Sequence, residues 1–279
     1  MTFLDITATP AKRKISGLNK RPDGSEFVRL DCESGYVDGI FKRVTGSDAL
    51  IVMFPSAMPA SALTEKRFPH LPRWQWVDEI PANVWCFEEV IARRYNIAGG
   101  WFHERDHFYA DSIAEIIQEI ASELCISSDR ITMMGSSLGG FGALMAAPKI
   151  AGSKVVADIS QTNLISYHVR RAIEDFCEKI YHTRDVDAVN AANPDRFSVI
   201  ERFRKVGHVP DMTILHDISD EPNGHQQIYP FFTELANLQS TEGHSFKFEG
   251  MLRNAGRGHI ALHKFAMLPI LYDIAEIKV

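Results

Sequence analysis

A run of small residues, Gly135 to Gly140 (GSSLGG), stands between an apolar segment and a helical one and limits this chain to few folds. The apolar segment 130–134 is typical of a buried strand, and 138–147 is typical of a helix packed closely against a sheet. A glycine-rich turn that joins a strand directly to a helix is a feature of layered α/β proteins. The run therefore predicts a sharp strand-to-helix turn with a serine at its centre.

The spacing of the glycines identifies Ser137 as the residue at the apex of this turn. Gly135 and Gly139 stand two positions before and after it, where the backbone crowds itself in a turn of this kind. Centring the turn on Ser136 would place larger side chains at the two crowded positions. A serine at such an apex, beside the N–H groups that begin a helix, is a candidate nucleophile.

Short apolar runs recur along the chain, and after the first three they alternate with segments of helical periodicity. This order predicts an α/β fold with a mostly parallel eight-stranded sheet covered by helices on both faces. The clearest helix follows Asp111, where Ser112 and Glu115 form a capping box before an apolar stripe. The other predicted helices cover 138–147, 169–181, 226–238 and 260–277, and the predicted strands cover 27–30, 36–41, 49–54, 84–87, 130–134, 154–159, 212–216 and 245–249.

The composition fits one folded domain over residues 1–279. A content of 45% hydrophobic and 24% charged residues excludes a disordered or low-complexity chain. Two long connections, 55–83 and 161–210, are candidate lid or binding segments, because long connections in a compact domain often carry function.

The charge and the cysteine content indicate which classes of partner the chain binds and in which cellular compartment it is expected. The net charge is −6 and no long basic run is present, which argues against nucleic-acid binding. No signal peptide and no apolar segment of about 18 residues is found, so we expect neither a membrane span nor a membrane partner. Four widely spaced cysteines, three of them in apolar segments, favour reduced core thiols in a cytoplasmic protein: Cys32, Cys86, Cys125 and Cys177.

A serine needs a base, and the base needs an acid to orient it. In α/β-hydrolases these follow the serine in the order acid, then histidine. Asp217 and Asp220 follow the predicted strand 212–216, and His259 follows the last predicted strand in a Gly-flanked loop. Asp220 is the preferred acid because Asp217 directly abuts its strand, although both remain candidates.

Two backbone N–H groups are expected to form an oxyanion hole beside Ser137. One is that of Leu138, the residue after the nucleophile, and the other comes from the loop after the third strand. In that loop Pro55 has no N–H, so Ser56 is the better donor and Ala57 the alternative.

These residues together resemble the α/β-hydrolases from about residue 27 to the end of the chain. More narrowly, four motifs resemble a bacterial group of hydrolase-like proteins tied to capsular polysaccharide biosynthesis and accessory secretion: Gly99-Gly100-Trp101, GSSLGGF at 135–141, Gln161-Thr162 and Asp220…His225. The resemblance implies esterase or acyltransferase chemistry on glycans, with Ser137, Asp220 and His259 as the triad. Trp101 and His225 then become candidate substrate contacts.

A rival motif, His103-Glu104-Arg105-Asp106-His107, spells H-E-x-x-H. On a helix it would bind Zn²⁺ through two imidazoles, with Glu104 as the base. It falls instead in a loop before the predicted helix, and no apolar stripe flanks it. We therefore expect no metal, while His103 remains a candidate for lining a substrate pocket at this sheet edge.

The sequence thus predicts a serine esterase that needs no cofactor and acts on a small-molecule or glycan ester. Three alternatives remain open: an acyltransferase to a glycan hydroxyl, a zinc hydrolase using His103 and His107, and a non-catalytic binding module with the hydrolase fold. The sequence does not favour any oligomeric state.

Overall fold

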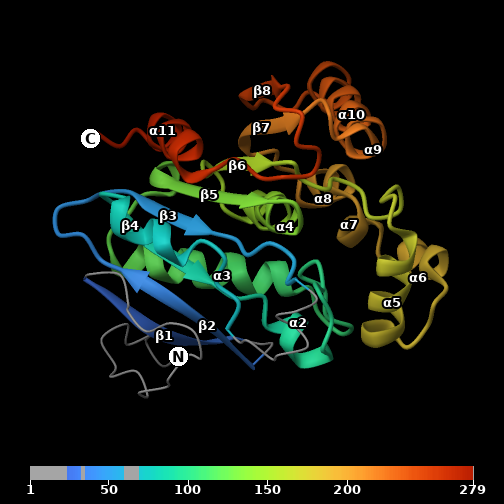
Figure 1. Cartoon of the computed structure of the whole chain (residues 1–279), viewed down its shortest axis with the longest axis horizontal. Coiled ribbons are helices and arrows are strands. Elements are labelled where there is room, and N and C mark those ends of the chain that lie inside the picture. Colours follow the sequence, from blue (N-terminus) through green and yellow to red (C-terminus); the bar gives the residue numbers. More distant parts are fainter. Residues whose placement is uncertain (1–23, 33–34, 60–68, 279) are drawn as a thin grey trace.

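The computed structural model describes residues 24–32, 35–59 and 69–278 of the 279-residue chain. The chain forms one eight-stranded sheet in the order β1-β2-β4-β3-β5-β6-β7-β8 (Figure 1). β1 pairs antiparallel with β2 and β2 with β4, while all later pairs are parallel. The strands are β1 (Ser25–Cys32), β2 (Gly35–Lys42), β3 (Leu50–Met53), β4 (Asn83–Phe87), β5 (Ile131–Ser136), β6 (Lys154–Asp158), β7 (Asp211–Asp217) and β8 (Phe248–Arg253).

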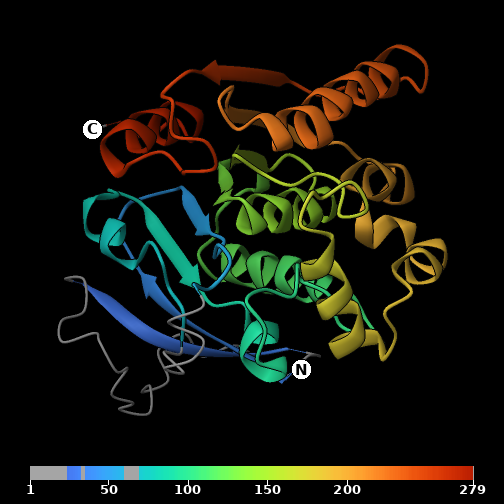
Figure 2. The same ribbon diagram turned by 45° about the vertical axis from the view of Figure 1, so that its right-hand side comes forward.

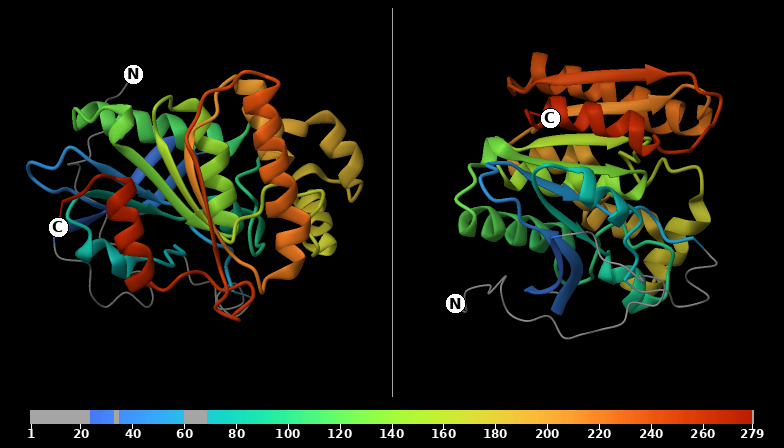
Figure 3. Two further views of the ribbon diagram at one scale, coloured as in Figure 1. Left: turned by 90° about the horizontal axis from the view of Figure 1, so that it is seen from above. Right: turned by 60° about the vertical axis from the view of Figure 1, so that its left-hand side comes forward.

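Helices cover both faces of this sheet, as the alternating pattern predicts (Figure 3). One face is covered mainly by α3 (Tyr109–Glu123), α4 (Leu138–Ala146), α8 (Val199–Val206) and α10 (Tyr229–Ser240), and the other by η1 (Trp74–Glu79) and α11 (Lys264–Ile274). The remaining elements are α2 (Val90–Tyr95), η2 (Ser128–Arg130), η3 (Ala147–Lys149), α5 (Arg170–Tyr181), α6 (Val186–Ala192), α7 (Pro194–Phe197), α9 (Glu221–Asn223) and η4 (Gly224–Ile228). Figures 1 and 2 show α5 and α6 on the side of the molecule remote from α11.

The strands divide their side chains between two apolar cores. In β3, Leu50 and Val52 join the core under α3 and α4, whereas Ile51 and Met53 join the core under α11. All four residues are buried, which is why the strand is a continuous apolar run without polar alternation. Burial on both faces fixes this strand in the centre of the sheet.

The register brings the carboxyl ends of the central strands to one edge. Met53 at the end of β3 pairs with Met134 in β5, and Ser136 at the end of β5 pairs with Asp158 at the end of β6. Asp158 in turn pairs with Leu215 in β7. Loops that leave these strands therefore meet at the same edge, where open α/β sheets bind ligands.

Several element boundaries differ from the predicted ones. α3 begins at Tyr109, and Ser112 lies buried inside it, because Tyr109 and Ala110 pack into the core and extend the helix. β8 runs later than the predicted 245–249, and α11 begins at Lys264 instead of residue 260. Most β8 residues are exposed, so no buried face marks the register of this edge strand in the sequence.

The two predicted lid segments lie in different structural contexts. Of segment 55–83, residues 60–68 lie outside the described residues, and the remainder includes η1, which packs on the face that α11 covers. Segment 161–210 contains α5, α6, α7 and α8. In the described part of the chain, no helix is long and apolar enough to cross a membrane.

The cysteines match the expected core location only in part. All four are free thiols. Cys86 and Cys177 are buried, but Cys125 is exposed where the chain leaves α3. Its left-handed backbone (φ 55°) turns the chain away from the helix and out of the apolar pattern.

Candidate active site

Ser137 forms the apex of a sharp turn between β5 and α4. Its backbone has φ 55° and ψ −123°, a strained conformation for a residue with a side chain. Its N–H donates to the Asp158 carbonyl at 2.9 Å, which ties the turn to the end of β6. A Cβ on Gly135 would lie 2.2 Å from the Gly139 carbonyl carbon, so the position two before the serine must be glycine.

Gly139 brings the loop after β3 against the same turn. A Cβ at this position would lie 2.7 Å from both the Phe54 and the Pro55 carbonyl oxygens. The Phe54 N–H also donates to the Met134 carbonyl at 2.8 Å. The residues after β3 therefore pack directly on the nucleophile turn.

The two expected oxyanion donors lie on this side of Ser137. Leu138 is the first residue of α4, so its N–H has no partner within the helix. Ser56 follows Pro55 in the loop that Gly139 contacts, and its N–H makes no hydrogen bond within the described residues. Neither N–H group therefore has a hydrogen-bond partner in the described part of the chain.

His259 connects Ser137 to Asp220. Its Nε2 lies 2.8 Å from Ser137 Oγ and its Nδ1 lies 2.6 Å from Asp220 Oδ2. Asp220 sits at the start of α9, just after β7, and only 5% of its side chain is exposed. His259 lies in the loop between β8 and α11, with 32% of its side chain exposed. The structure therefore brings together the three residues expected from sequence.

Asn223 supports the acid and is absent from the sequence-based prediction. Its Nδ2 donates to both Asp220 carboxylate oxygens, at 3.0 and 2.9 Å, and lies 2.8 Å from His259 Nδ1. Asn223 is fully buried one turn after Asp220. The i, i+3 spacing of Asp220 and Asn223 would indicate this contact if the segment were known to be helical. A helix of one turn is rarely recognisable from sequence.

The alternative acid, Asp217, faces other partners. It is the last residue of β7 and accepts from the Ser219 N–H and hydroxyl, at 3.0 and 2.7 Å, and from the Ala255 N–H at 3.2 Å. Its carboxylate also lies 3.6 Å from Arg253 Nε. Asp220, not Asp217, is the acid in contact with the histidine.

Gln161 also reaches the nucleophile. Its Nε2 donates to Ser137 Oγ at 3.0 Å, although the two residues are far apart in sequence. The sequence offers a weak signal, because Gln161 follows the strand next to that of the nucleophile. Side-chain direction at the end of a strand cannot be derived from the chain alone.

The three expected substrate contacts are not all accessible. Trp101 is 6% exposed, and its ring packs on Phe176 at 5.6 Å and on Tyr167 at 6.1 Å. His225 is exposed beside Tyr229, at a ring distance of 5.5 Å. Both stay candidates.

His103 disagrees with its expected role in a substrate pocket. The ring is fully buried, with Nδ1 2.9 Å from the Tyr181 hydroxyl and Nε2 2.7 Å from the Arg196 carbonyl. Burial lowers the pKa of His103 to about 3, so the ring stays neutral. Both ring nitrogens already have hydrogen-bond partners within the protein. His103 therefore has a structural role and is not placed to contact substrate.

The contacts of residues 103–107 argue against a zinc site formed by the H-E-x-x-H motif. Residues 103–107 form a loop, and Glu104 pairs with Arg94 and with His107. Among the described residues, no group of three or more His, Cys, Asp or Glu side chains is arranged to hold a metal ion. These contacts argue against the alternative in which His103 and His107 bind zinc, because a buried hydrogen-bond network already uses both ring nitrogens of His103.

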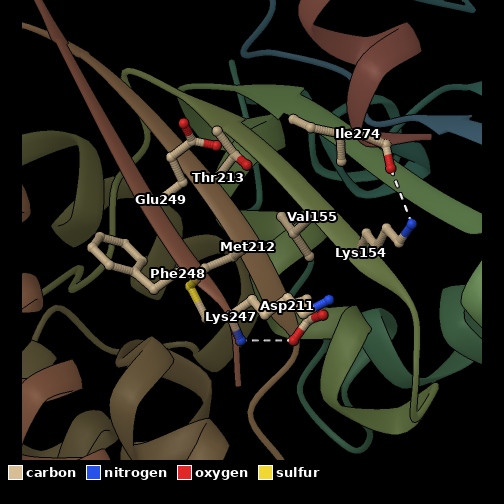
Figure 4. Close-up of a pocket in the computed structure, with 9 residues that line it drawn as sticks. All are labelled: Lys154, Val155, Asp211, Met212, Thr213, Lys247, Phe248, Glu249 and Ile274. Atoms are coloured by element: carbon tan, nitrogen blue, oxygen red, sulfur yellow. Dashed lines mark hydrogen bonds between the residues drawn. The ribbon is translucent and has the colours of Figure 1, made fainter. Parts of the chain in front are cut away.

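A cavity of about 220 Å³ lies away from this site (Figure 4). It is lined by Lys154, Asp211 and Phe248, the first residues of β6, β7 and β8. Lys154 Nζ is held there by the Ile274 carbonyl at 3.1 Å. The cavity thus sits at the amino ends of the strands, opposite the edge that carries Ser137.

Comparison with known proteins shows similarity in structure only. No family model matches the chain, and no curated protein matches its sequence. A fluorophosphonate-binding serine hydrolase of Staphylococcus aureus is similar with a TM-score of 0.58 at 11% identity, over 90% of this chain and 98% of that one. The capsule O-acetyltransferase of Neisseria meningitidis serogroup A has a TM-score of 0.58 at 12% identity, over 93% and 97% of the two chains.

A glycosylation-associated protein complex from Streptococcus agalactiae is similar over part of its length. The TM-score is 0.56 at 13% identity, and the match covers 91% of this chain but only 45% of that one. The chain therefore has the α/β-hydrolase fold.

Proposed function

We propose that the protein is a serine esterase that cleaves a carboxylic ester through Ser137, His259 and Asp220. The observation that carries the proposal is the unbroken line of contacts from Asp220 Oδ2 through His259 to Ser137 Oγ, at 2.6 and 2.8 Å. Such a line is the arrangement that activates a serine hydroxyl. The fold supports ester hydrolysis or acyl transfer as the general class.

In this proposal each residue has a distinct role. His259 Nε2 takes the proton from Ser137 Oγ as the oxygen attacks the ester carbonyl, and Asp220 holds the ring through Nδ1–H. The Leu138 and Ser56 N–H groups stabilise the negative oxygen of the tetrahedral intermediate. His259 then gives its proton to the departing alcohol oxygen, which leaves an acyl group on Ser137.

Water or an acceptor hydroxyl completes the reaction. His259 removes a proton from the incoming O–H group as its oxygen attacks the acyl carbon, and the same proton then goes to Ser137 Oγ. An acyltransferase differs from an esterase only in this acceptor. The similarity to a capsule O-acetyltransferase supports a glycan hydroxyl as the alternative acceptor, and makes a glycan ester a candidate substrate.

The test is covalent labelling with a fluorophosphonate probe. We expect wild-type protein to label and Ser137→Ala not to label, with no effect of a zinc chelator on either. A folded wild-type protein that does not label would overturn the proposal and favour a non-catalytic binding module.

A further inference from the structure

A second strained turn lies beside that of Ser137, at the end of β6. Ile159, the next residue, has φ 44°, a left-handed conformation that is rare for a β-branched side chain. Its N–H donates to the Leu215 carbonyl at 2.8 Å, so the conformation is held by the sheet. Strain of this kind is characteristic of functional sites.

The strained turn returns the chain over the nucleophile helix. Ser160 packs on Gly140, where a Cβ would lie 2.8 Å from the Ser160 side chain. The next residue is Gln161, whose Nε2 meets Ser137 Oγ at 3.0 Å. The backbone conformation at Ile159 thus directs Gln161 at the nucleophile.

The buried Gln227 fixes the residues that follow. Its Oε1 accepts from the Thr162 and Asn163 N–H groups at 2.8 and 2.9 Å, and its Nε2 donates to the Asn163 carbonyl at 3.0 Å. The Thr162 hydroxyl donates to the Gln227 carbonyl at 2.9 Å. Because this bracket is almost fully buried, the position of Gln161 is set before any substrate binds.

The sheet order places Gln161 on the alcohol side of the reacting ester. In the order β3-β5-β6-β7, Ser56 follows β3 on one side of Ser137, while Gln161 follows β6 on the other, as does Asp220 after β7. An ester bound with its carbonyl oxygen at Leu138 and Ser56 directs its alcohol oxygen toward His259. Gln161 therefore follows a strand on the opposite side of Ser137 from Ser56, on the side of the alcohol half.

We propose that the Gln161 carboxamide binds a hydroxyl of the alcohol half of the substrate, and that this half is a polyol or sugar. A carboxamide both donates and accepts, as a hydroxyl does, and within the described residues Gln161 Oε1 accepts no hydrogen bond. The inference rests on the proposed function, because it assigns the substrate of the same site.

The test compares two acetyl esters in Gln161→Leu. Methyl 6-O-acetyl-glucopyranoside has a polyhydroxyl alcohol, whereas p-nitrophenyl acetate has none. We expect Gln161→Leu to lower kcat/KM on the sugar ester about tenfold more than on the aryl ester, since one hydrogen bond is lost. The control is Gln226→Leu, the same change at the exposed residue that precedes Gln227 in the sequence. It is expected to leave the ratio of the two kcat/KM values unchanged.

Two results would overturn the inference. One is an equal loss on both esters in Gln161→Leu, which would limit Gln161 to holding Ser137. The other is a wild-type protein that labels with the fluorophosphonate but does not cleave the sugar ester. A wild-type protein that neither labels nor cleaves p-nitrophenyl acetate contradicts the proposed function itself. Gln161→Met replaces Gln161→Leu if the latter does not fold.

Discussion

Two aspartates close to the end of β7 differ in what their carboxylates contact, and this difference predicts losses of catalysis of very different size. Asp220 contacts His259, so Asp220→Asn is expected to lower kcat on p-nitrophenyl acetate by about 10³–10⁴-fold, because an amide cannot stabilise the imidazolium. Asp217 contacts Ser219 and Ala255 instead, and Asp217→Asn is expected to lose less than about tenfold. Steady-state kinetics on folded variants measures both. Equal losses would show that the acid has been misassigned.

A second prediction concerns Gly139. A methyl group there would lie 2.7 Å from the Phe54 and Pro55 carbonyl oxygens and would push the loop that carries Ser56 away from the serine. We expect Gly139→Ala to reduce kcat by about 10²-fold, as the loss of one oxyanion donor does. The matched control is Gly250→Ala, whose Cβ meets only side-chain atoms of Phe232 and Phe248, at 3.4 Å. An active Gly139→Ala would contradict the assignment of this loop.

At the residue scale, the sequence predicts what depends on local spacing. The glycines around Ser137 are a steric requirement of one turn, so they are visible in a few consecutive letters. Asn223 and Gln161 act through side-chain direction, and the contact of Gln161 joins residues on separate strands. His103 is a residue that the sequence suggests for the site but that the structure places elsewhere. Nothing in the H-E-x-x-H string shows that its two ring nitrogens are bonded to Tyr181 and Arg196.

At the scale of elements, the loop that carries His259 is held by a partly buried arginine. Arg253, the last residue of β8, donates to Asp158 Oδ1 and to the Ile260 carbonyl, both at 3.0 Å. Asp158 Oδ2 accepts from the Leu262 N–H at 2.7 Å. Ile260 and Leu262, which follow His259, are therefore attached to the ends of β8 and β6, and these contacts limit where its ring can lie.

Removing this arginine is expected to weaken both folding and catalysis. Arg253→Met leaves the carboxylates of Asp158 and Asp217 buried without their cation, which costs about 3–5 kcal/mol. Urea denaturation measures the loss of stability, and the rate of fluorophosphonate labelling measures the displacement of His259. The double variant Arg253→Met/Asp158→Asn is expected to regain part of the stability, because one unpaired charge is gone. A labelling rate equal to that of the wild type would contradict the positioning role.

The same segment shows why the element boundaries could be predicted only in part. β3 is buried on both faces, so its apolar run marks it within a residue at each end. β8 exposes most of its side chains, and the segment before α11 is apolar without being helical. Leu262 is bonded to Asp158, and the His263 side chain accepts from the Phe265 N–H as the cap of α11. Tertiary contacts therefore decide where this helix begins, and they are not visible in its periodicity.

At the scale of the whole molecule, two buried apolar cores and one shared sheet edge explain why the fold could be predicted. The alternation of apolar runs and helical stripes is a property of the entire chain, and it predicts a parallel sheet with helices on both faces. The register of that sheet then brings the ends of β3, β5, β6 and β7 together. Polar residues that are distant in sequence meet there without any local signal.

The free energy of unfolding of the whole molecule is expected to depend on pH through one buried carboxyl group, that of Glu89. Glu89 follows β4 and accepts from the Gly100 and Phe102 N–H groups at 2.9 and 2.7 Å. Burial raises its pKa from 4.5 to about 7, with the two N–H groups opposing the shift. The folded state therefore holds a proton that the unfolded chain releases near pH 4.5. Stability from this group is fully present below pH 4.5 and is lost as the pH rises through about 7.

Glu89→Gln removes this ionisation while it keeps an acceptor for the same loop. We expect the unfolding free energy of the variant, relative to wild type, to rise by about 2 kcal/mol between pH 5 and pH 8, since each pKa unit is worth 1.4 kcal/mol. Denaturant unfolding at several pH values measures the difference, and subtraction cancels the titration of all other groups. A difference that is constant with pH would mean that Glu89 ionises in the folded protein as it does in the unfolded chain.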